Sequence, residues 1–177
     1  SKGLLEARPK VGTKVAPRNR WNYFDPMLLE WLFHAGPDEQ LVRSVTSVRL
    51  ALEPLAAAEF AKSHTADQIR LMRYWLHQME MSISSPLNFA LADFEIHLII
   101  ADGSKNQFTR SMMPLVEFGH ACVYQPAIAD MGEINASQVA LHAKLIEAVE
   151  TGSMDKAMIA MKDIVNAEST GFGEVNP

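Results

Sequence analysis

From Asp25 onward, apolar residues recur every three or four positions between signals that start and stop helices, which excludes most architectures other than a helical bundle. Asp25-Pro26 opens a short helix that Gly36-Pro37 ends. No strand-like alternation follows residue 20, so we expect an all-α, antiparallel bundle of six to seven helices. After the first helix, the predicted helices cover residues 38–64, 65–81, 85–103, 106–125, 135–152 and 153–166, with a loop over 126–134.

The longest predicted helix, over residues 38–64, has an apolar stripe that should face the core. Pro54 lies inside this helix and is expected to kink it, because its ring removes one backbone hydrogen bond. The stripe consists of Leu41, Val45, Val48, Leu52, Leu55 and Phe60.

The N-terminal segment has a different pattern from the rest of the chain. Two short apolar runs, Leu4-Leu5 and Val15-Ala16, flank Pro9 and Gly12, which predicts a β-hairpin. An isolated hairpin is at best marginally stable, so this one requires a neighbour. The chain is therefore expected to divide into a hairpin (1–18), a linker with a short helix (19–37), a helical domain (38–170) and a tail (171–177).

Charge is distributed unevenly along the chain. Residues 1–20 carry a net charge of +5, whereas the remaining residues carry −10, within a total of −5. An acidic body repels a nucleic-acid backbone, while a short basic arm could contact one or could simply be solvated. The single cysteine, Cys122, excludes an internal disulfide, and no stretch has the roughly 18 consecutive apolar residues of a membrane span. We therefore expect a soluble cytoplasmic protein with no membrane partner.

Two predicted helices place polar residues within apolar stripes. In the helix over 85–103, Asp93 and His97 are four residues apart on the core-facing side. A buried carboxylate is costly unless it is paired or binds a cation. Asp93, His97 and His142 therefore predict either a divalent metal site with open coordination positions or a polar cluster whose members satisfy one another. His142 belongs to this set because it stands within the stripe of Val139, Ile146 and Val149.

Arg49 and His120 are two further candidates. Arg49 and Glu53 are four residues apart, so they could form an exposed ion pair, or Arg49 could point inward and bind an anionic ligand. His120 shares a stripe with Val116 and Val123, which is typical of a core histidine and also allows a ligand contact. The sequence has no glycine-rich phosphate loop, His-Glu-x-x-His, Gly-x-Ser-x-Gly or EF-hand loop, which weakens an enzymatic interpretation.

Several motifs follow one another in an order that resembles a known family. They are Arg49-x-x-x-Glu53, Asp93-x-x-x-His97, Gly103-Ser104-Lys105-Asn106, and His142 before an Ile-Glu-Ala-Val segment. This order resembles the C-terminal effector domain of GntR-superfamily transcriptional regulators of the FadR subfamily, an all-α bundle of six or seven helices. Residues 1–15 resemble the wing hairpin that ends the family's winged helix-turn-helix, and the linker over 16–26 is similar to that of sugar-acid (galactonate-type) repressors.

The resemblance favours a ligand role for Asp93, His97 and His142, with zinc, manganese or nickel as the divalent ion. Many relatives have a third histidine in the last helix, where this chain has Ile164. That difference implies a weaker site, a site completed by water and effector, or no metal. The family's recognition helix should precede Ser1, so the resemblance also implies a truncated regulator that contacts DNA only through a domain mostly missing from this chain.

The expected function is sensing of a small carboxylate effector, a hydroxy acid of the sugar-acid class, by a homodimeric regulator. The effector's carboxylate and hydroxyl could chelate the metal while Arg49 neutralises its charge and His120 adds a contact. Two alternatives remain open. One is a metal-dependent enzyme of the two-histidine-one-carboxylate type, and the other is a metal-free acyl or fatty-acid sensor in which the same residues bond only to one another.

Overall fold

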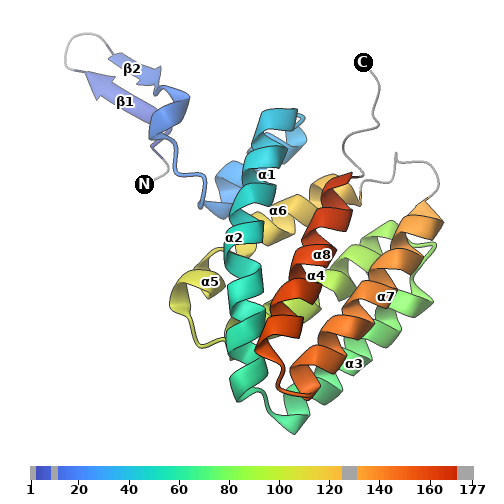
Figure 1. The fold of residues 1–177 in the computed structure, drawn as a ribbon. Helices are drawn as coiled ribbons and strands as arrows, with labels where there is room; N and C mark the ends of the chain where they lie inside the picture. Colours follow the sequence, from blue (N-terminus) through green and yellow to red (C-terminus); the bar gives the residue numbers. More distant parts are fainter. Residues whose placement is uncertain (1–2, 9–11, 125–130, 171–177) are drawn as a thin grey trace.

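Residues 3–8, 12–124 and 131–170 are described by the computed structural model, and in them a helical bundle follows a small β-hairpin (Figure 1). This confirms the predicted all-α architecture with a preceding hairpin. In chain order the elements are β1 (Leu5–Arg8), β2 (Gly12–Val15), the 3-10 helix η1 (Arg18–Arg20), α1 (Pro26–His34), α2 (Glu39–Ser63), α3 (Ala66–Met81), α4 (Pro86–Gly103), α5 (Gln107–Ser111), α6 (Met113–Val123), α7 (Met131–Glu150) and α8 (Met154–Thr170).

Strands β1 and β2 pair antiparallel through the apolar runs that predicted them. Leu5 lies opposite Val15, and the backbone N–H of Ala16 donates to the Leu4 carbonyl at 2.8 Å. Leu5 and Val15 are 67% and 69% exposed, and the hairpin stands apart from the bundle in Figure 1, so its apolar side chains add little to the core. Its turn, over residues 9–11, lies outside the described residues.

The helix ends are set by local capping signals. The Thr65 side chain accepts from the backbone N–H of Gln68, whose side chain accepts from the backbone N–H of Thr65, and this capping box starts α3. Gly152 has a φ of +68°, which lets Ser153 donate to the Ala148 carbonyl at 2.9 Å and closes the end of α7. Residues of this kind explain why the predicted boundaries of α2, α3 and α4 agree closely with the observed ones.

Three of the predicted helices differ from the observed ones. The helix predicted over 106–125 is divided into α5 and α6, because Pro114 has no backbone N–H and fits the first turn of a new helix. The described residues therefore contain eight α-helices rather than seven. Helix α7 begins at Met131 rather than Asn135, and α8 continues to Thr170 rather than ending near Asn166. The rest of the predicted loop and the predicted tail fall on residues 125–130 and 171–177, outside the described part.

The buried face of α2 differs from its predicted stripe. Leu55, which was expected in the core, is 43% exposed, whereas Arg49 and Glu53 are 2% and 5% exposed. Helix α8 lies alongside α2 (Figure 1), and the buried face of α2 includes Ala56 and Ala57, whose small side chains let neighbouring helices approach closely. The prediction followed the largest apolar residues and so missed a face built from alanines and an ion pair. Helix α2 also continues through Pro54 as one element.

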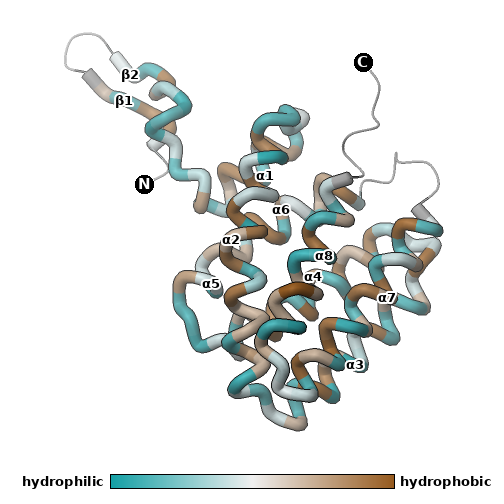
Figure 2. The backbone as a smooth tube through the Cα atoms, viewed as in Figure 1, coloured by the Kyte–Doolittle hydropathy of each residue, from teal (hydrophilic) through white to brown (hydrophobic). Residues whose placement is uncertain are grey.

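The apolar core of the described residues consists of two clusters. One cluster joins α3, α4, α7 and α8 to the C-terminal half of α2, and the other joins α1 and α6 to its N-terminal half. On α2, Arg49 and Glu53 lie between Val45 of the second cluster and Ala56 of the first. Figure 2 shows hydrophobic and hydrophilic residues alternating along the helices, as expected of elements with one buried face. Among the described helices, none is sufficiently long and apolar to cross a membrane.

Candidate metal centre

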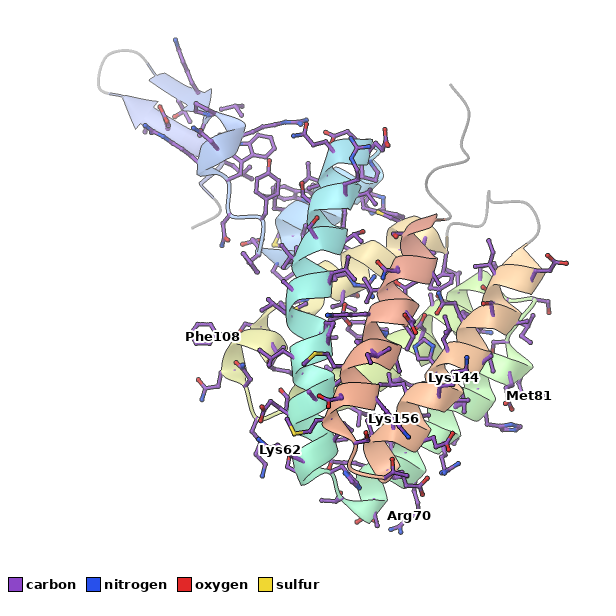
Figure 3. All side chains as sticks on the ribbon, viewed as in Figure 1. Lys62, Arg70, Met81, Phe108, Lys144 and Lys156 are labelled. Carbon is purple, nitrogen blue, oxygen red and sulfur yellow. The ribbon has the colours of Figure 1, made fainter. Side chains whose placement is uncertain are left out.

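The buried Asp, Glu, His and Arg side chains of the described residues gather at one place inside the bundle. Each is at most 5% exposed. By contrast, the side chains of Arg70, Met81 and Phe108, which are labelled in Figure 3, point away from the bundle. Five helices contribute to the cluster: α2 (Arg49, Glu53), α4 (Asp93, His97), α6 (His120), α7 (His142) and α8 (Glu168).

The three predicted metal ligands converge within this cluster. The Oδ1 atom of Asp93 lies 2.9 Å from Nε2 of His142 and 3.3 Å from Nε2 of His97. All three atoms are buried, and although they face one another at these distances, none of them makes a well-aligned hydrogen bond. Buried polar atoms without a partner are rare in folded proteins, so this group requires an explanation.

Both imidazoles are held from their other side. The Nδ1 atom of His97 contacts the Glu53 carboxylate, and the Nδ1 atom of His142 lies 2.8 Å from the backbone carbonyl oxygen of Gln138. An acceptor at Nδ1 places the proton there and leaves the lone pair of Nε2 free. The arrangement is therefore the one in which a histidine binds a cation through Nε2 while a second residue fixes its orientation.

Tyr124 fixes the carboxylate of Asp93 in the same way. Its hydroxyl donates to Asp93 Oδ2 at 2.6 Å, which leaves Oδ1 facing the two imidazoles. Burial, followed by the nearby Asp93 charge, raises the pKa of Tyr124 well above its ordinary range, so the hydroxyl keeps its proton. Burial alone would raise the pKa of Asp93, but the facing His120 and His142 hold it well below its usual value. Asp93 is therefore a carboxylate, and one of its oxygens is available.

The carboxylates of Glu53 and Asp93 stabilise a positive charge on His97, which lies between them. Burial alone would lower the pKa of His97, but Glu53 and Asp93 raise it to about 10. Burial alone would raise the pKa of Glu53, but Arg49 and His97 lower it to about 2. Without a cation, a second proton on His97 is thus stabilised from two sides, and a metal ion that binds Nε2 would replace this proton.

Arg49 points inward, so the alternative of an exposed ion pair is wrong. Its Nε donates to Glu53 at 2.6 Å, its Nη1 donates to Glu168 at 2.5 Å, and one Nη2 contact of 3.3 Å reaches Nε2 of His120. Burial alone would lower the pKa of Arg49, but the charges of Glu168 and Glu53 outweigh burial and hold the pKa above its ordinary value. Gly119 gives the guanidinium space, because a Cβ at that position would lie 3.0 Å from Nη1.

Glu168 is a site residue that the sequence prediction missed. Its predicted helix ended near Asn166, whereas α8 continues for another turn and carries Glu168 one turn beyond Ile164. The Oε1 atom of Glu168 has no hydrogen-bond partner and lies 3.5 Å from Nε2 of His120. Asp93, His97, His120 and Glu168 each offer a ligand atom, and these four atoms lie within 4.8 Å of one another. The available signal was the spacing of four residues between Ile164 and Glu168.

The charge and the donor atoms of the cluster fit a divalent cation. Three carboxylates against one guanidinium leave a formal charge of −2 when the imidazoles are neutral, and a divalent cation would neutralise this charge. Ligand atoms bonded to one metal at about 2.1 Å stand roughly 3.0–3.4 Å apart, close to the distances from Asp93 to the two histidines. Mixed imidazole and carboxylate donors suit zinc, manganese or nickel.

The space beside these groups is small. A cavity of about 10 Å³ borders Glu53 and His97, and its other walls include Ile100, Met113 and Met161. A volume of this size is about the minimum for one water molecule. A sugar acid would therefore need side chains of the cluster to move.

Comparisons with known proteins point to one family. The model of the FCD domain matches residues 44–167. The galactonate operon transcriptional repressor of Escherichia coli K12 is 25% identical over 177 residues, covering 99% of this chain and 76% of the repressor. The uncharacterized HTH-type transcriptional regulator YieP of the same strain is 25% identical over 172 residues, covering 94% of this chain and 72% of YieP.

Solved structures show the same fold at lower identity. A GntR protein of Streptococcus agalactiae matches with a TM-score of 0.67 and 21% identity, covering 96% of this chain and 75% of that protein. The E. coli protein McbR/YncC matches with a TM-score of 0.69 and 11% identity, covering 98% of this chain and 74% of that protein.

Proposed function

This chain belongs to the FCD-domain family of GntR/FadR-type transcription regulators, and on this premise we propose that it senses a small hydroxy acid through a buried divalent cation. FCD domains are effector domains of regulators, so the chain is not an enzyme. The observation that carries the proposal is the convergence of three buried, unpartnered atoms, Oδ1 of Asp93 and Nε2 of both His97 and His142.

Asp93, His97 and His142 would hold the cation, and the surrounding residues would keep them in position. Glu53 and Gln138 fix the two imidazoles, and the Tyr124 hydroxyl fixes the carboxylate. When bound, the cation supplies open coordination positions to oxygen atoms of an effector. His120 and Glu168 border these positions, because their nearest polar atoms lie close to those of Asp93 and His97.

A hydroxy acid matches both parts of this site. Its carboxylate and neighbouring hydroxyl offer two oxygen donors to a cation, and Arg49 lies in the same cluster with a charge of opposite sign to the carboxylate. A buried anion requires such charge matching. The sugar acids are the first class to test, because a relative that aligns with nearly the whole chain is named a galactonate operon repressor.

Control of operator binding would follow from a change in helix packing. An effector shifts an equilibrium only when it binds one packing of the helices more tightly than the other. In a homodimer that reads two half-sites about 34 Å apart, a modest change at the bundle would alter the spacing of the DNA-reading heads. We therefore place the protein in the cytoplasm as a dimeric regulator, with the β1–β2 hairpin as part of a DNA-binding wing.

Calorimetric titration of the full chain tests the proposal. The expected result is stoichiometric binding of Zn²⁺ or Mn²⁺, followed by binding of galactonate or a related sugar acid that chelator abolishes. Binding of the acid that is equal with and without chelator would favour the metal-free sensor. Release of a product from the acid in the presence of Fe²⁺ would contradict the assignment as a non-enzymatic sensor.

A further inference from the structure

The carboxylate of Glu168 lies between the guanidinium of Arg49 and the ligand atoms of the candidate metal centre. Its Oε2 accepts from Nη1 of Arg49 at 2.5 Å, and its Oε1 faces His120 at 3.5 Å with no hydrogen-bond partner. One of its oxygens also lies within 4.8 Å of ligand atoms of Asp93 and His97. The carboxylate of a metal-chelating effector would need this same position, next to both the cation and Arg49.

We propose that Glu168 occupies a carboxylate subsite on Arg49, and that a ligand's carboxylate binds there by displacing Glu168. The subsite consists of the Nη1 and Nη2 side of Arg49, the Nε2 side of His120, and the space that Gly119 leaves for the guanidinium. Its ligand class is the small organic carboxylate. The choice of a hydroxy acid rests on the proposed function, whereas the subsite itself depends only on Arg49 and Glu168.

The two carboxylates on Arg49 differ in how firmly they are held. Glu53 lies inside α2 and contacts both Arg49 and His97, so its removal would disrupt two buried partners. Glu168 lies in the last turn of α8, two residues before the helix ends, and among the described residues its side chain accepts a hydrogen bond from Arg49 alone. The ends of helices open at a lower free-energy cost than their interiors. Glu168 is therefore the carboxylate that a ligand displaces.

Exchange of one carboxylate for another also avoids the main cost of binding inside the bundle. The adjacent cavity of about 10 Å³ has no room for an acid, so some side chain must leave. If a neutral group left, the ligand would add an unmatched negative charge to the interior. If Glu168 leaves, the buried charge is unchanged, Arg49 remains paired, and the displaced carboxylate regains its hydration.

The exchange would transmit binding to the end of the bundle. In this structure the Arg49–Glu168 pair ties the last turn of α8 to the middle of α2. A ligand on Arg49 would break that tie, so the two states differ in a defined contact, which is what coupling between sites requires.

Chemical rescue of the full chain tests the displacement. In E168A, acetate should raise the melting temperature in a saturable way, because it binds only the folded state and restores a partner to Arg49. The wild type and E150A, which removes the exposed partner of Arg73, should show no such response at matched ionic strength. Equal responses of E168A and E150A to acetate would overturn the inference, as would loss of the rescue when chelator is added.

A second variant covers the case in which E168A fails to fold. E168Q keeps the shape of the side chain, but the neutral amide pairs less strongly with Arg49 and is displaced more readily. The E168Q protein should therefore bind galactonate about tenfold more tightly than the wild type. Unchanged or weaker binding by E168Q would contradict the displacement. Failure of the proposed function would be seen separately, as the absence of Zn²⁺ or Mn²⁺ binding by the wild type without any acid.

Discussion

The Nε2 atom of His142 on α7 lies 2.9 Å from the Oδ1 atom of Asp93 on α4, yet neither atom has a hydrogen-bond partner. Both residues are fully buried. A carboxylate oxygen and an imidazole nitrogen so placed, each fixed from its other side, present two lone pairs to a common point. This geometry supports the proposal that a divalent cation binds in the cluster.

Replacement of either imidazole should remove metal binding. H97A and H142A each lose one of the three proposed ligands, so we expect the affinity for Zn²⁺ to fall by a factor of roughly 100 or more. Isothermal titration calorimetry measures this affinity, and metal analysis of the purified variants checks it. H77A is the matched control, because His77 is exposed and faces Glu80 rather than the cluster, and it should bind Zn²⁺ as the wild type does. Wild-type affinity in H97A and H142A would contradict the ligand assignment.

Removal of the Tyr124 hydroxyl should weaken the metal centre without destroying it. Y124F frees Oδ2 of Asp93, so the carboxylate can rotate away from the imidazoles, and we expect Zn²⁺ affinity to fall by about 10–100-fold. The aromatic ring remains in the core, where it packs against Phe89. Y74F, which changes an exposed tyrosine, should leave Zn²⁺ affinity unchanged in the same titration. A Y124F protein with unaltered affinity would show that the hydroxyl does not position Asp93.

Glu53 should contribute a defined part of the stability lost in acid. Its folded pKa of about 2 lies below the ordinary value of 4.5, so its contribution to stability is present above pH 4.5 and is lost as the pH falls toward 2. This loss is on the order of 3 kcal/mol. In urea unfolding from pH 2 to 6 without metal, E53Q should show a shallower decrease in the free energy of unfolding. E59Q, at a partly exposed position, should follow the wild type, and identical slopes for E53Q and the wild type would refute the assignment.

A methyl group at Gly103 should destabilise the fold. A Cβ there would lie 2.2 Å from two ring carbons of Phe60, which is itself fully buried and has little room to move. We expect G103A to lower the free energy of unfolding by about 1–3 kcal/mol or more. G132A is the matched control, because nothing lies within 4 Å of a Cβ at that position in α7, and it should be neutral or stabilising by up to about 1 kcal/mol. Equal thermal unfolding of both variants would contradict the packing argument.

The sequence by itself determined the helices, the hairpin and the inward direction of the three proposed ligands. Caps and breakers act within a few residues, so Asp25, Thr65 and Gly152 reveal helix ends without any tertiary information. Helical spacing likewise determines which residues share one face of a helix, which is why Asp93, His97 and His142 could be assigned to core-facing stripes.

Only the tertiary structure decided how these stripes meet. Periodicity left Arg49 either exposed or buried, and the close contact of α8 with α2 resolved the question, because it covers the side of α2 that carries Arg49. The same contact brings Glu168 to Arg49 across 119 residues of sequence. Distances between side chains of different helices depend on how those helices pack, and no pattern within a single helix encodes them.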